Sequence, residues 1–117
     1  MKRYTGGCHC GLVRFEAQME EIKEAMTCNC SHCSKRGFIL AFIPASQFTL
    51  LQGEDSLTTY HFHKKVIDHL FCKVCGIEAF GRGKGPDGTD TFALNLRCVD
   101  DLDLKALTLS EYQGKDI

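Results

Sequence analysis

The sequence predicts an all-β fold in one domain of 117 residues. Its apolar residues fall into short runs, and some of them alternate with polar residues at the period of a half-buried strand. Glycine, proline and polar residues separate these runs. No segment sustains the helical period of about 3.6 residues, so we expect strands to supply the core.

The first two predicted strands cover residues 11–18 and 38–43. In the first, Val13, Phe15 and Ala17 alternate with charged and polar neighbours, which places the apolar side chains on one face. The second is a short apolar run between Gly37 and Pro44, too short for a useful helix and suited to a buried strand.

Five further strands are predicted in the rest of the chain, at residues 48–51, 57–62, 66–71, 79–80 and 91–96. The polar residues 63–65 predict a hairpin turn, and the glycine-rich stretch 81–88 predicts a mobile loop between the last two strands. Weak helix signals occur at 45–48, after a proline, and at 101–107.

The charge balance argues against polyanionic partners. Fourteen basic and 15 acidic residues give a net charge of −1, which provides no overall field to attract nucleic acid or a membrane surface. The first residues lack the apolar stretch of a signal peptide, and no run reaches a membrane-spanning length. We therefore expect a cytoplasmic protein with no nucleic acid and no membrane among its partners.

The eight cysteines are the most informative residues of the chain. Seven fall into three tight clusters with C-x-C and C-x2-C spacing, which can close a tetrahedral shell around zinc. A disulfide framework is the alternative, but thiols stay reduced in a cytosol and seven clustered cysteines with one outlier make a poor disulfide set. The clusters are Cys8 and Cys10; Cys28, Cys30 and Cys33; and Cys72 and Cys75.

The two pairs are assigned to a structural zinc. A zinc ion held by four thiolates has no vacant position, so such a site fixes the backbone and does no chemistry. Cys8 and Cys10 precede the first predicted strand, whereas Cys72 and Cys75 follow a strand far along the chain. A shared ion would clip these distant segments together.

The triplet is assigned to a second zinc with an open position. Three protein ligands leave the fourth position of a tetrahedral ion for water or substrate. Three thiolates lower the Lewis acidity of the ion, so a soft ligand such as an incoming thiol suits it better than water does. Cys28, Cys30 and Cys33 are thus the residues with which we associate catalysis.

Two alternatives stay open from spacing. Cys98 or His32 could supply a fourth ligand and close the triplet, and the pairs could be exchanged between clusters. Cys98 is otherwise expected to be a small buried hydrophobe outside the metal set. Because His9 lies inside a cysteine cluster, we expect it to be a metal ligand or a residue that supports a ligand. The remaining histidines are expected to be solvated or to have hydrogen-bond partners in the core; they are His61, His63 and His69.

The motifs around these cysteines resemble the glutathione-dependent formaldehyde-activating (GFA) family, also called the CENP-V/GFA domain. The likeness covers nearly the whole chain, so one domain of this type is expected over residues 1–117. The motifs that carry it are Gly6-Gly7-Cys8-His9-Cys10-Gly11 with Val13-Arg14-Phe15, Cys28-Asn29-Cys30-Ser31-His32-Cys33 with Gly37, Phe71-Cys72-Lys73-Val74-Cys75-Gly76, and Asn95-Leu96-Arg97-Cys98-Val99-Asp100.

The resemblance implies a tent-like arrangement of antiparallel sheets and two zinc ions per chain. It matches Cys8, Cys10, Cys72 and Cys75 to structural zinc ligands, and Cys28, Cys30 and Cys33 to catalytic zinc ligands. It also implies a carbon–sulfur lyase of the S-hydroxymethylglutathione synthase type, which joins a small thiol such as glutathione to a small aldehyde such as formaldehyde. No role for Cys98 follows from it.

Two other functions fit the same cysteines. A non-catalytic zinc module could present a sheet or loop to a protein partner, and it would have two closed sites. Zinc storage or sensing would instead require the ion at the triplet to exchange readily.

Overall fold

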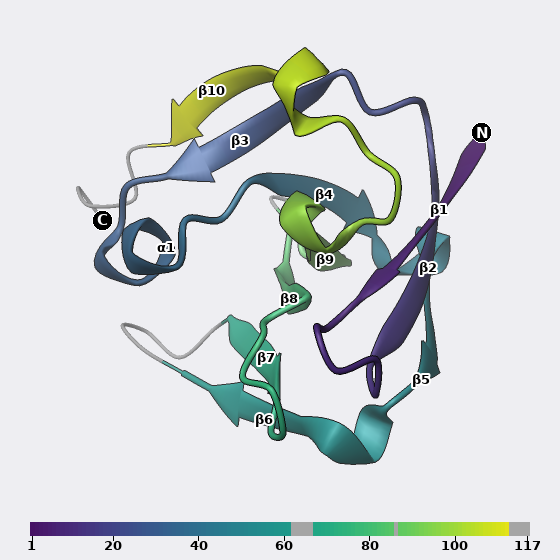
Figure 1. Ribbon diagram of the computed structural model, residues 1–117. Helices are drawn as coiled ribbons and strands as arrows, with labels where there is room; N and C mark the ends of the chain where they lie inside the picture. The colour runs from purple at the N-terminus through teal and green to yellow at the C-terminus, as the bar shows by residue number, and fades with distance from the viewer. Residues whose placement is uncertain (62–66, 86, 113–117) are drawn as a thin grey trace.

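The computed structural model describes residues 1–61, 67–85 and 87–112, and their strands form two sheets. This confirms the prediction of an all-β fold. Residues 62–66, which the predicted strands and hairpin include, lie outside the described part, and so does residue 86 of the predicted loop. Figure 1 shows the smaller sheet beside the larger one, with the only α-helix among the described residues at the far side of the larger sheet.

The smaller sheet has the strand order β1-β2-β5 and is antiparallel throughout. Its strands are β1 (Lys2–Gly7), β2 (Arg14–Met19) and β5 (Phe48–Gln52). The predicted alternation holds in β2, where Phe15 and Ala17 are fully buried and Arg14 and Glu16 are half-buried. This sheet therefore packs one face on the core.

The larger sheet has the strand order β10-β3-β4-β9-β8-β7-β6. Its pairs are antiparallel except for β10 and β3, which run parallel. Its strands are β3 (Glu24–Cys28), β4 (Leu40–Pro44), β6 (Leu57–Tyr60), β7 (Asp68–Cys72), β8 (Phe80–Lys84), β9 (Asp90–Asn95) and β10 (Thr108–Tyr112).

An aromatic cluster joins the two sheets. Phe15 and Phe48 come from the smaller sheet, and Phe80 and Phe92 come from the larger one. Phe48 stacks on Phe92 with ring centroids 4.0 Å apart and an interplanar angle of 6°, and Phe15 meets Phe80 edge to face. Such pairs contribute beyond their buried area, so this cluster holds the sheets face to face.

Several elements differ from the sequence prediction. Residues 81–84 belong to strand β8 and are not part of a loop, because each of them pairs with β7 or β9. Three strands, β1, β3 and β10, were not predicted, since they are short and lack a clear apolar alternation. The helix α1 (Ser31–Arg36) was not predicted either, because its six residues are all polar or cysteine.

The weak helix signals correspond to single turns of 3-10 helix. These are η1 (Ala45–Gln47) and η4 (Leu104–Ala106), and two more turns, η2 (Glu54–Ser56) and η3 (Leu96–Cys98), lie elsewhere. Each is three residues long, a length at which 3-10 geometry is common. They connect strands and do not form a layer of their own.

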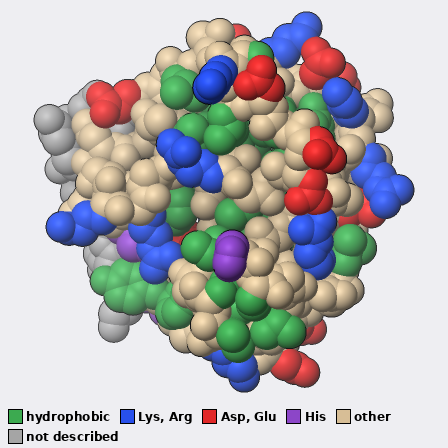
Figure 2. Space-filling model, viewed as in Figure 1, with side chains coloured by type: hydrophobic (Ala, Val, Ile, Leu, Met, Phe, Trp, Pro, Cys, Tyr) green, Lys and Arg blue, Asp and Glu red, His purple; other side chains and the backbone are tan. Residues whose placement is uncertain are grey.

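On the face drawn in Figure 2, acidic and basic side chains are interspersed, so no large area carries charge of a single sign. This agrees with the net charge of −1. In the described part of the chain, no helix has the length and apolar character needed to cross a membrane.

Gly7 leads into the first cysteine pair and has no space for a side chain. A Cβ atom there would lie 2.0 Å from the carbonyl oxygen of Val13. We expect Gly7→Ala to lower the free energy of unfolding by about 2 kcal/mol or more, because the β1–β2 turn must open to admit a methyl group. Urea unfolding of the purified protein measures this loss.

The control for this change is Gly88→Ala. Gly88 has φ +83° but nothing within 4 Å of its Cβ position, so the substitution costs only the left-handed backbone penalty of about 1 kcal/mol. Equal losses in the two variants would show that the turn before Cys8 is not sterically constrained.

Candidate metal centre

The structure brings Cys8, Cys10, Cys72 and Cys75 together. One sulfur from each lies within 4.8 Å of all the others. The sulfur of Cys10 is 3.6 Å from that of Cys8 and 3.6 Å from that of Cys72. Four thiolates on a tetrahedral zinc with Zn–S bonds of about 2.3 Å would be about 3.8 Å apart, so this donor set fits zinc.

Two turns position these sulfurs. In the β1–β2 turn, the Cys8 amide donates to the Val13 carbonyl at 3.1 Å, and the Val13 amide donates back to the Cys8 sulfur at 3.3 Å. In the turn after β7, the Cys72 amide donates to the carbonyl of Ile77 and the Gly76 amide donates to that of Cys72. The group therefore joins the smaller sheet to the larger one.

The thiols of this group differ in acidity. Burial opposes ionisation of Cys75, but the backbone amides of Cys10 and Ile77 donate to its sulfur, and they and the neighbouring thiols lower its pKa to about 6. At Cys10, the Leu12 amide favours the thiolate, but desolvation and the three neighbouring sulfurs outweigh it and raise the pKa to about 12. Cys75 thus ionises more readily than Cys10, and a cation would favour the thiolate form of all four.

The second group consists of Cys28, Cys30 and Cys33, whose sulfurs also lie within 4.8 Å of one another. Cys28 ends β3, Cys30 is the N-cap of α1 and Cys33 lies within that helix. The Cys33 amide donates to the Cys30 sulfur at 3.3 Å, so the cap itself sets the spacing of two sulfurs. Cys28 and Cys30 are half-buried and Cys33 is buried.

The local contacts also separate the acidities of these three thiols. Burial opposes the thiolate of Cys30, but the Cys33 amide and the neighbouring thiols outweigh it and lower its pKa. Burial raises the pKa of Cys28. Burial also raises the pKa of Cys33, and hydrogen bonds to the sulfurs of Cys28 and Cys30 and the charges on them raise it further. Cys30 is therefore the thiol of this group that gives up its proton most readily.

Neither residue suggested as a fourth ligand for the triplet joins it in the structure. Cys98 lies in η3, where burial and then the nearby charges of Cys8 and Cys75 raise its pKa to about 11, so it sits beside the four-cysteine group. His32 belongs to another cluster, in which it lies within 4.8 Å of groups on His69 and Glu78. The structure thus groups the seven clustered cysteines as four and three, and their role as zinc ligands stays a prediction.

The cluster of His32, His69 and Glu78 was not expected from the sequence. His69 is buried in β7, as is the next residue, Leu70, and Glu78 follows β7 in the turn before β8. No local pattern connects either residue with a histidine on α1, so spacing could not reveal the cluster. Burial, followed by the charges of His69 and Arg36, lowers the pKa of His32 to about 4.

The other histidines differ in surroundings. His61 is partly exposed and pairs with Asp68 at 2.5 Å, and His9 is exposed, so neither His9 nor His61 joins a metal-binding group among the described residues. His63 lies outside the described residues.

The segment from Asn95 to Asp100 connects the two cysteine groups. The side chain of Asn95 donates to the backbone carbonyl of Glu78 at 3.0 Å and accepts from the Arg97 amide. Arg97 donates to the carbonyl of Gly37, the C-cap of α1, at 2.8 Å. At the other end, Asp100 accepts from Arg14 in β2. This segment therefore ties the turn after Cys75 to the helix that carries Cys33.

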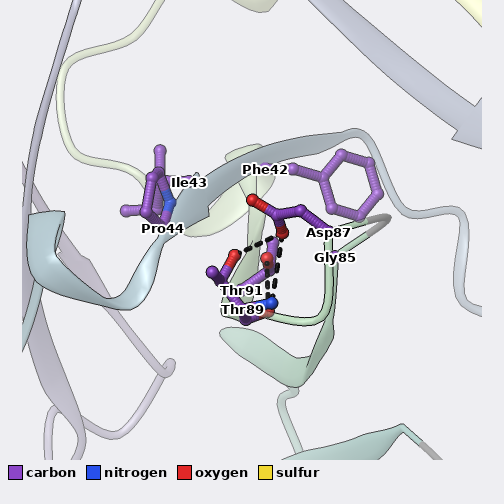
Figure 3. A pocket seen from close by; sticks show the side chains of 7 residues that line it. All are labelled: Phe42, Ile43, Pro44, Gly85, Asp87, Thr89 and Thr91. Atoms are coloured by element: carbon purple, nitrogen blue, oxygen red, sulfur yellow. Dashed lines mark hydrogen bonds between the residues drawn. The ribbon is translucent and has the colours of Figure 1, made fainter.

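A shallow hollow of about 380 Å³ lies between β4 and the turn before β9. Figure 3 shows Ile43 and Pro44 at one end, the ring of Phe42 beside Asp87 at the other, and Thr89 and Thr91 between them. Asp87 accepts from both the amide and the hydroxyl of Thr89, so its carboxylate is used within its own turn. No cysteine or histidine is among the described residues that line this hollow, and we assign it no chemistry.

We expect Asn95→Ala to lower the free energy of unfolding by about 1–3 kcal/mol, because it leaves the buried Glu78 carbonyl without its donor. Asp103→Ala is a matched control, since Asp103 caps η4 through the same side-chain-to-amide bond but is exposed. Asp103→Ala should lower the free energy of unfolding by less than about 1 kcal/mol. Denaturant unfolding of both variants tests the difference, and a loss at Asp103 as large as that at Asn95 would contradict it.

Comparison with known proteins gives the family of this chain. A protein of known crystal structure from Rhodobacter sphaeroides is similar to it, with 26% identity, a TM-score of 0.77, and coverage of 91% of this chain and 99% of that one. Residues 3–112 match the family model described as glutathione-dependent formaldehyde-activating enzyme, abbreviated GFA. With that match over nearly its whole length and with two cysteine groups that could hold metal, the chain belongs to the GFA family.

Proposed function

We propose that this chain activates a small, glutathione-like thiol at Cys28, Cys30 and Cys33 for reversible addition to a small aldehyde such as formaldehyde. The observation that carries the proposal is the three-sulfur group at the start of α1, which leaves Cys28 and Cys30 only half-buried and so within reach of a small molecule. Membership of the GFA family supports this reaction class.

We propose two zinc ions per chain, one in each cysteine group. The four-cysteine group would be structural, since its four sulfurs complete a tetrahedral shell. At the three-cysteine group, zinc would lower the pKa of an incoming thiol and hold it as the thiolate nucleophile. All eight cysteines are free thiols in the structure, which suits a reducing compartment such as the cytoplasm.

The addition of the thiol to the aldehyde needs no external oxidant or reductant. The thiol sulfur forms a bond to the aldehyde carbon, the carbonyl π bond becomes the C–O single bond of a hydroxymethyl group, and the thiol proton ends on that oxygen. The contribution of the chain is to present Cys28, Cys30 and Cys33 at a fixed spacing. The hydrogen bond from the Cys33 amide to the Cys30 sulfur maintains that spacing.

NMR exchange measurements on glutathione and ¹³C-formaldehyde test the reaction. We expect a low concentration of the protein to raise the rate of adduct formation above the uncatalysed rate. Cys30→Ser should return the rate to the uncatalysed value, because it removes one of the three sulfurs. Cys98→Ser is the matched control and should keep the activity, since Cys98 lies outside both groups. A wild-type rate equal to the uncatalysed one would refute the proposed activity.

Metal analysis of two variants separates this proposal from a non-catalytic zinc module. We expect Cys30→Ser to remain folded with one zinc fewer, because its group is local to one turn and one helix. Cys72→Ser should lose zinc and unfold at lower denaturant, because Cys72 is fully buried and belongs to the group that joins the two sheets. Circular dichroism and elemental analysis measure both. Global unfolding of Cys30→Ser would instead favour two structural sites.

A further inference from the structure

His32, His69 and Glu78 come from three separate elements and meet in the interior. His32 lies on α1, His69 on β7, and Glu78 in the turn between β7 and β8. Their side chains are only 9%, 9% and 5% exposed. Three groups that can bind a cation are thus collected in one buried place, although they are distant in the sequence.

The distances within this cluster are short. Nδ1 of His69 lies 3.3 Å from Oε2 of Glu78, and Nε2 of His32 lies 3.7 Å from Oε1. The two imidazole rings have centroids 4.1 Å apart. One ligand atom from each residue lies within 4.8 Å of the other two. Ligands on a tetrahedral zinc with bonds of about 2.0–2.1 Å are about 3.4 Å apart, so small side-chain adjustments would place all three on one ion.

The carboxylate of Glu78 has an unusual environment. Its Oε1 atom is buried and accepts no hydrogen bond from the residues that the structure describes. Around it are His32 Nε2 at 3.7 Å and a guanidinium nitrogen of Arg36 at 3.8 Å, both beyond ordinary hydrogen-bond length. Burial of a carboxylate oxygen is costly unless a cation or donor compensates for it.

From this geometry we propose that His32, His69 and Glu78 form a third metal site, separate from both cysteine groups, for a divalent first-row transition cation such as zinc. Two imidazole nitrogens and one carboxylate oxygen form a donor set that suits such cations. Hard cations that require several oxygen ligands suit it poorly. The carboxylate would neutralise one of the two charges of the ion, and Oε1 would gain a partner.

Arg36 is the charged group that opposes this site. Its guanidinium approaches Glu78 Oε1, donates to the carbonyl of Gly76 at 3.5 Å and lies over the ring of Phe71. Because its side chain is 31% exposed, it can turn toward solvent when a cation enters. The two positive charges compete for one carboxylate, so the affinity for the metal should rise when Arg36 loses its charge.

The test adds Zn²⁺ to protein whose cysteine groups are already loaded with zinc and follows the histidine imidazole ¹⁵N resonances by NMR. We expect the resonances of His32 and His69 to shift with one further equivalent. Those of His61 should stay unchanged, because it pairs with Asp68 near the surface. Atomic absorption after dialysis counts the same additional ion. Failure to shift His32 and His69 would overturn the proposal.

Variants complete the experiment. Glu78→Gln keeps the shape but removes the charge, and it should weaken binding of this ion by more than about a hundredfold, beyond the usual effect of losing a supporting residue. Arg36→Gln should tighten it. Should Glu78→Gln fail to fold by its amide spectrum, His69→Gln serves in its place. Zinc binding in Glu78→Gln or His69→Gln equal to that of wild type would overturn the proposal.

The cysteine groups are read out independently in the same samples. Cobalt bound by thiolates gives sulfur-to-metal charge-transfer absorption, whereas nitrogen and oxygen ligands give none. Cobalt added to the zinc-loaded protein should therefore bind without new charge-transfer bands. If charge-transfer bands grow with the added equivalent and the resonances of His32 and His69 do not shift, the added ion lies in a cysteine group. That result would contradict a third site.

Discussion

The meeting of Cys8 and Cys10 with Cys72 and Cys75 is the constraint on which the arrangement of the two sheets depends. Cys10 and Cys72 are 62 positions apart, yet their sulfurs are within 3.6 Å. Sulfur is a weak hydrogen-bonding group, so four thiols alone would hold these turns loosely. The aromatic cluster between the sheets supplies cohesion at a second place, and a metal shared by the four sulfurs would supply a covalent-like link across a long loop.

The three-cysteine group is organised differently, because its members are close in sequence. An N-cap contact and one short helix set its geometry, without a distant segment. The connection to the remaining fold passes through the segment 95–100, where Arg97 holds the C-cap of α1 and Asn95 holds the turn after Cys75. A local site mounted on a structurally constrained helix can keep its spacing while one side stays accessible to a small molecule.

The helix α1 contributes to two sites at once. Successive residues on a helix are about 100° apart, so Cys33 and His32 point to different sides. Cys33 packs with Phe38 and Leu40. His32 also meets the Phe38 ring, but it lies beside His69 and stacks on Tyr60, with centroids 5.6 Å apart. A displacement of this helix would therefore affect the thiol group and the histidine cluster together, which makes the two sites structurally dependent although their ligands differ.

Patterns of neighbouring residues were enough to predict the β class, the alternating strand at Val13 to Ala17 and the composition of each cysteine cluster, because these features depend on side chains a few positions apart. Long-range contacts determined the remainder. Residues 81–84 form a strand because β7 and β9 lie on either side, and His32 meets Glu78 only because the fold brings α1 beside the turn between β7 and β8. Such encounters arise from burial and packing between segments that no local spacing relates.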